Sequence, residues 1–67
     1  MNLWKQIAKE IRADAKGHVC SAELNRIAQH IERGDIIAAI DSALELPTEP
    51  VDYKTKYCVK LGYRIDL

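Results

Sequence analysis

The sequence predicts an all-α fold, a small bundle of three to four helices in a single domain over residues 1–67. Apolar residues recur at helical spacing through the first two thirds of the chain. Gly34 and Asp35 together join the end of one helix to the start of the next, which makes a very short turn. The hydrophobic share is 48%, yet the chain has no Phe, one Trp and three Tyr. The core must therefore consist of aliphatic residues, which suits closely packed helices.

The first helix is expected from about Asn2 to Ala15. Its apolar side chains fall on one broad face when successive residues are rotated by about 100°. These residues are Leu3, Trp4, Ile7, Ala8, Ile11 and Ala15. Gly17 ends this helix, and residues 18–20 form the connection to the next one.

Residues 21–46 are expected to form a helical hairpin. Ser21 is a favourable N-cap for the second helix. The buried stripe of that helix is predicted to be Leu24, Ile27, Ala28 and Ile31. Gly34 suits the position just after a helix, where a positive φ costs glycine little, and Asp35 suits the N-cap of the third helix. That third helix runs from Ile36 to Leu46, and its wide apolar arc predicts that it is the most buried of the helices.

Residues 51–67 admit two interpretations. Apolar and polar residues alternate along the whole segment, which is a strand pattern, but a strand of this length would be too long for so small a domain. A helix from about Pro50 to Leu61 is favoured, because Pro is tolerated in a first turn and Gly62 follows the end. Its inward side chains would be Val51, Thr55, Cys58 and Leu61. An extended, apolar C-terminal tail from Tyr63 to Leu67 would dock on the bundle or pair with another chain.

The segment from Gly34 to Pro47 resembles the second half of a tetratricopeptide repeat. In that family a Gly opens the second helix and an Ala five residues later packs on the first, and Gly34 and Ala39 have this spacing. The pair at residues 43–44 comes about one turn early, and Ile27 stands where the family has a small residue. The resemblance implies a helical hairpin, and a single unit makes no repeat array.

A basic line follows the first helix. Lys5, Lys9, Arg12 and Lys16 fall within about 60° of one another on a helical projection, away from the two acidic residues of the same helix. Such a line could receive an acidic protein surface or a run of phosphates. The alternative is an ordinary solvent-facing surface.

Charge is distributed unevenly, although the formal net charge is zero. Residues 1–20 carry four basic and two acidic side chains, residues 21–50 carry two and six, and residues 51–67 carry four and two. Asp41 and Glu45 lie one turn apart near the end of the third helix, where they repel each other and oppose the helix dipole. A cation from the same chain or from a second subunit would relieve them, so head-to-tail or two-fold self-association is one hypothesis.

Four further residues are candidates for partner binding, because Trp, Tyr and Arg often carry interface energy. They are Trp4, Tyr57, Tyr63 and Arg64. Tyrosines interleaved with lysines can also stack on the bases of single-stranded nucleic acid.

No catalytic, cofactor-binding or metal-binding residues are predicted. The cysteines, Cys20 and Cys58, and the two histidines lack the spacing of a metal site, and no nucleophile motif or glycine-rich phosphate loop is present. Both cysteines are expected to be reduced thiols, since the sequence shows no secretory signal or membrane-spanning run. A cytoplasmic location is expected.

The sequence therefore predicts a small protein-protein interaction module that acts as a stoichiometric adaptor or inhibitor of a larger partner with an acidic surface, without catalysis. Small neutral helical proteins of this kind are frequent among phage and mobile-element proteins. One alternative is a nucleic-acid binder that uses the basic line. Another is a homodimer whose C-terminal tails are exchanged between subunits.

Overall fold

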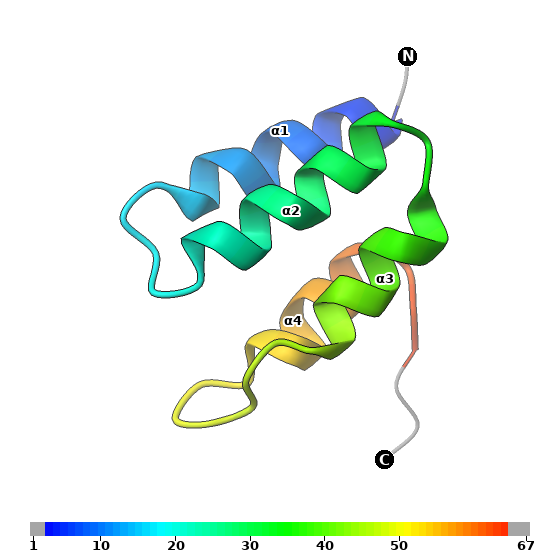
Figure 1. Ribbon diagram of the computed structural model, residues 1–67. Coiled ribbons are helices and arrows are strands. Elements are labelled where there is room, and N and C mark those ends of the chain that lie inside the picture. Colours follow the sequence, from blue (N-terminus) through cyan, green and yellow to red (C-terminus); the bar gives the residue numbers. More distant parts are fainter. Residues whose placement is uncertain (1–2, 65–67) are drawn as a thin grey trace.

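The computed structural model describes residues 3–64 of the chain. This part contains four α-helices joined by short connections. They are α1 (Leu3–Ala15), α2 (Ser21–Glu32), α3 (Ile36–Leu44) and α4 (Tyr53–Lys60). Successive helices run in opposite directions, and both the start of α1 and the end of α4 lie at one end of the bundle (Figure 1). The predicted all-α bundle is confirmed.

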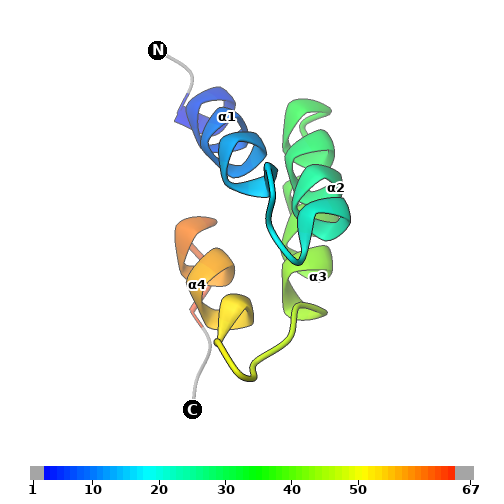
Figure 2. The same ribbon diagram turned by 90° about the vertical axis from the view of Figure 1, so that its left-hand side faces the viewer.

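The helices pack in chain order, and the last returns to the first. α2 packs against both α1 and α3, and α3 packs against α4. Two side-chain contacts then join α4 to α1: the Tyr57 hydroxyl donates to Asp14 at 3.1 Å, and Lys60 pairs with Glu10 at 2.9 Å. Figure 2 shows α1 and α4 on one side and α2 and α3 on the other, so α1 and α3 lie diagonally across the bundle.

The turn between α2 and α3 forms as predicted. Gly34 adopts a φ of +79°, and its N–H donates to the carbonyl of Ile31, while the N–H of Asp35 donates to the carbonyl of His30. These two bonds define a Schellman motif, which satisfies the last carbonyls of a helix. The Asp35 carboxylate accepts from the backbone N–H of Ala38 at 3.1 Å and caps α3. One short segment thus ends one helix and begins the next.

The start of α2 differs from the prediction. Ser21 is the first helical residue and Cys20 is the N-cap, without a capping side-chain hydrogen bond. The N–H of Cys20 donates to Nδ1 of His18 at 2.9 Å, and Ser21 N–H donates to the His18 carbonyl. The turn after Gly17 places residue 21 inside the helix, and the His18 ring satisfies the backbone N–H of the N-cap residue Cys20.

The prediction that the third helix is the most buried is wrong. α2 buries its whole predicted stripe, Leu24, Ile27, Ala28 and Ile31. α3 ends at Leu44, two residues earlier than predicted, and buries only Ala39 and Ala43 within its length, while Ile37 is 83% exposed. The small alanines face the core, the bulkier Ile36, Ile40 and Leu44 are only partly buried against it, and Ile37 lies outside.

Residues 53–60 form a helix, so the favoured interpretation of this segment is confirmed and the strand alternative is excluded there. The Asp52 carboxylate accepts from the backbone N–H of Thr55 at 2.9 Å and caps α4. Gly62, with a φ of +81°, follows the helix as predicted. Local capping therefore overrides the alternating pattern.

The inward face of α4 is only partly the predicted one. Cys58 and Leu61 are buried as expected, but Val51 is 48% exposed and Thr55 is half-buried. Tyr57 is completely buried and faces α1. Both cysteines are buried free thiols, and burial raises the pKa of the Cys58 thiol.

Several expectations concern the two ends of the sequence. Tyr63 and Arg64 are exposed and non-helical beyond α4. Asn2, the predicted start of the first helix, lies outside the described residues. The same holds for residues 65–67, which complete the predicted tail. Over residues 3–64, no helix has the length and apolar character that crossing a membrane requires.

Replacing Tyr57 by Phe should destabilise the fold modestly. The substitution keeps the ring in the core but removes the hydrogen bond to Asp14, which should cost about 1 kcal/mol of unfolding free energy. Urea unfolding followed by circular dichroism measures this change. Tyr63→Phe is the matched control and should change stability by less than about 0.5 kcal/mol, because Tyr63 is exposed. Equal effects of the two variants would contradict the proposed role of the Tyr57 hydroxyl.

Tyr57 should also ionise later than an ordinary tyrosine. Burial, assisted by the hydrogen bond to Asp14, raises the pKa of Tyr57 from 10.0 to about 12. Its contribution to stability is therefore complete below pH 10 and disappears as the pH rises toward 12. Ultraviolet titration of tyrosinate should show one delayed step among the three tyrosines, and Tyr57→Phe should remove that step.

Candidate interaction surface

The basic line predicted on the first helix lies on the surface of the bundle. Lys5, Lys9, Arg12 and Lys16 are all exposed, on α1 and on the residue that follows it. Within residues 3–64, neither Lys9 nor Lys16 has a carboxylate within ion-pair distance. Two positive charges about 10 Å apart along one helix face are therefore available to another molecule.

Arg12 is the exception in this line. Its guanidinium forms a two-bond contact with Glu32 of α2, with both bonds 2.7 Å long, and a weaker contact with Asn25 at 3.4 Å. The hydrogen bond to Arg12 holds the pKa of Glu32 below its ordinary value. The sequence argument missed this neutralisation because it compared charges only within the first helix. Glu32 comes twenty residues later, and α2 brings it alongside.

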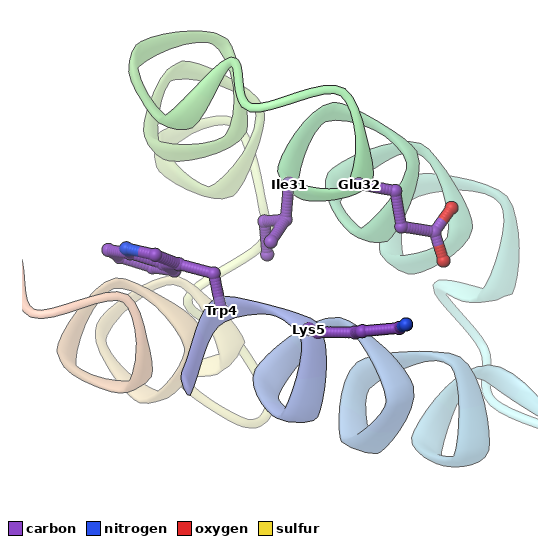
Figure 3. A pocket seen from close by; sticks show the side chains of 4 residues that line it. All are labelled: Trp4, Lys5, Ile31 and Glu32. Carbon is purple, nitrogen blue, oxygen red and sulfur yellow. The ribbon is translucent and has the colours of Figure 1, made fainter. Parts of the chain in front are cut away.

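A shallow hollow of about 290 Å³ lies where the start of α1 meets the end of α2, at one end of the basic line. It is lined by Trp4, Lys5, Ile31 and Glu32. Figure 3 shows the apolar side chains of Trp4 and Ile31 on one side and the charged Lys5 and Glu32 on the other. This volume is at the lower end of the range of small-molecule sites, about 300–1,000 Å³, and it has room for a side chain of a partner.

Trp4 combines packing with accessibility. It is half-buried, packs against the core and lines the hollow. It is therefore held in place by the bundle while part of its ring faces the hollow. A tryptophan of this kind supplies contact area with little loss of side-chain freedom, which is typical of residues that carry interface energy.

Tyr57 is not a surface residue, which corrects its prediction as a partner-binding residue. Its side chain is fully buried between α4 and α1, and its ring lies edge-on to His18 at 6.5 Å between centroids. The spacing of Tyr53, Tyr57 and Leu61, each four residues apart, was the sequence signal for an inward face. Counting tyrosines among lysines obscured that signal.

Tyr63 and Arg64 are exposed. They do not form one continuous surface with the full length of the basic line. They follow α4 at the end of the bundle where α1 begins, whereas Lys16 lies at the opposite end (Figure 1). The exchanged-tail dimer also needs residues 65–67, which lie outside the described residues. Its interface therefore stays a prediction.

The described acidic side chains differ in whether the fold engages them. Five are engaged by the fold, through an ion pair, a hydrogen bond or a helix cap: Glu10, Asp14, Glu32, Asp35 and Asp52. Asp41 and Glu45, near the end of α3, are, like Glu23 and Glu49, exposed and outside the ion pairs of residues 3–64. The cation that the sequence argument expected for this pair is thus not supplied by the described part of the same chain.

The histidine and cysteine residues do not assemble a metal site in the described structure. Between residues 3 and 64, no three His, Cys, Asp or Glu side chains come close enough together to hold a metal ion. His18 instead accepts the Cys20 N–H and contacts the Tyr53 ring edge at 4.6 Å between centroids. Its ring has a structural role in the turn between α1 and α2.

No family model matches the chain, and none of the curated proteins or solved structures matches it. The resemblance to a tetratricopeptide repeat is therefore confined to the shape of the hairpin that α2 and α3 form. The function has to be argued from the surfaces described above.

The two surface ion pairs should make stability depend on acid pH. Hydrogen bonds from Lys60 and Arg12 lower the pKa values of Glu10 and Glu32 below 4.5. Their contributions are therefore present above pH 4.5 and are lost as the pH falls through the lowered values. In Glu10→Gln/Glu32→Gln, unfolding midpoints measured across this range should vary less with pH than in the wild type. A parallel pH dependence would show that these pairs do not stabilise the fold.

Proposed function

We propose that this protein is a non-catalytic binding module that docks the basic line of α1 on an acidic surface of a larger protein, as a stoichiometric adaptor or inhibitor. The observation that carries the proposal is the exposure of Lys9 and Lys16 on one face without an ion pair in residues 3–64. Arg12 and Lys60, by contrast, are drawn into ion pairs between helices. Charges that the fold does not use are the ones free to steer a partner.

The hollow beside the line supports a protein partner in particular. Lys5 belongs to both features, so an acidic segment lying along α1 would place a neighbouring apolar side chain against Trp4 and Ile31. Charges at the rim speed association, whereas an apolar contact at the centre provides most of the affinity. A cytoplasmic partner and a cytoplasmic location are part of this proposal.

The nucleic-acid alternative has weaker support. Binding to phosphates depends on a surplus of positive charge, and the net charge of this chain is zero. Arg12 is already committed to Glu32, which removes one cation from the line. The lysines that remain in the line would give a weak, strongly salt-dependent contact.

Reversing the charges of Lys9 and Lys16 should abolish partner capture. Immobilised wild type is compared with Lys9→Glu/Lys16→Glu, and captured proteins are identified by mass spectrometry, purified and titrated calorimetrically for one-to-one binding. The matched control is Arg26→Glu/Arg33→Glu, which changes net charge equally through exposed residues outside the line. The control should keep the partner while the Lys9/Lys16 variant loses it.

Equal loss of the partner in both variants would mean that net charge matters and the α1 surface does not. Binding of a single-stranded oligonucleotide that Lys9→Glu/Lys16→Glu abolishes, measured by fluorescence anisotropy without any captured protein, would favour the nucleic-acid alternative instead.

A further inference from the structure

We propose that the free protein associates head to tail, with the basic line on α1 of one copy docked on an acidic stripe on α3 of the next copy. The stripe consists of Ile37, Asp41 and Glu45, which are spaced four residues apart along α3 and its C-cap. This inference rests on the proposed function, because the same face of α1 serves both contacts. It adds a second surface and names its occupant, a second copy of this chain.

The acidic stripe is a local cost that the described fold leaves uncompensated. Asp41 and Glu45 are like charges one turn apart, and both stand at the helix end where the dipole disfavours an anion. No Lys or Arg within residues 3–64 forms an ion pair with them. A cationic surface from outside the described bundle would remove both penalties.

The same chain carries the complementary surface. Lys9 and Lys16 lie on one face of α1, exposed and without ion pairs in the described range. Each surface thus presents two charges within two helical turns, and the charges are opposite in sign. Because the formal net charge is zero, two copies approach without overall repulsion, and these local surfaces decide how they meet.

Ile37 gives the stripe an apolar part. It is 83% exposed and lies one helical turn before Asp41. Lysine side chains lay their methylene stems on apolar surface while the ammonium groups reach acceptors. An incoming α1 would therefore cover Ile37 with lysine stems and place the ammonium groups near Asp41 and Glu45.

The geometry of the bundle determines the kind of assembly. α1 and α3 lie diagonally across the bundle, so their outer faces point away from each other (Figure 2). One two-fold contact cannot bring both surfaces of each copy together. The contact is therefore between two different surfaces, and repeated contacts of this type build open chains unless the rotation closes a ring. An acidic partner that occupies α1 would end such a chain.

The association should be visible in the mass of the purified protein. Light scattering over a concentration series at about 0.01 M salt, where charges act over about 30 Å, should show masses rising above the 7.6 kDa of the monomer. At about 1 M salt the mass should return to the monomer value. A monomer at every concentration in low salt would overturn the proposal.

Paired variants locate the interface. Lys9→Gln/Lys16→Gln and Asp41→Asn/Glu45→Gln should each weaken association by about tenfold or more, because each removes one side of the contact. Arg26→Gln/Arg33→Gln and Glu23→Lys make the same changes in net charge at exposed positions on or beside α2 and should associate as the wild type does. If these controls lose association equally, the contact is not between α1 and α3.

Mixing the two interface variants tests the head-to-tail arrangement. One variant retains the α3 stripe and the other retains the α1 line, so the mixture has a single complete contact. It should stop at twice the monomer mass, whereas a mixture that stays monomeric overturns the inference. Asp41→Asn/Glu45→Gln should lose self-association while still capturing the acidic partner. This variant separates failure of the inference from failure of the proposed function.

Discussion

The packing of the Tyr57 ring between α4 and α1, completed by its hydrogen bond to Asp14, is the contact on which the arrangement of the bundle depends. Tyr57 is the largest fully buried side chain, and a buried hydroxyl requires a partner. Asp14 provides the acceptor from α1, 43 residues earlier. α4 has only eight residues, too few for a helix that is stable alone, so it depends on this packing. Once the ring of Tyr57 is placed, Lys60 reaches Glu10, and α4 closes the bundle against α1.

The use of acidic residues links the fold to the proposed surfaces. Polar contacts link helices around the core, and Asp14, Glu10 and Glu32 supply the acidic side of each. The two ion pairs among these contacts offset the charges of Glu10 and Glu32 with those of Lys60 and Arg12. The charges that remain exposed on α1 and α3 are of opposite sign and lie on diagonal helices. A net charge of zero therefore conceals two separate surfaces of defined polarity.

Local rules predicted the features that depend on a few neighbouring residues. The Gly34–Asp35 turn and the stripe of α2 follow from backbone freedom, capping and helical period, and all were predicted correctly. The incorrect predictions concern residues whose roles depend on contacts between helices or on the local path of the chain. Ser21 is the first residue of α2 instead of its N-cap, and Tyr57 lies inward, where α1 offers an acceptor for its hydroxyl. The Arg12 contact with Glu32 spans two helices, which is why the sequence showed the basic line but not the pairing of Arg12 within it.

The two proposed contacts of α1 exclude each other, which gives self-association a consequence for binding. Lys9 and Lys16 face one molecule at a time, so a copy docked on the α3 stripe of its neighbour cannot dock on an acidic partner. The partner's apparent affinity is then reduced by the fraction of α1 surfaces already covered. By mass action, that fraction rises with the concentration of the protein itself. The exposed acids of α3, unfavourable for their own helix, would in this arrangement keep the basic line covered until a stronger acidic surface displaces them.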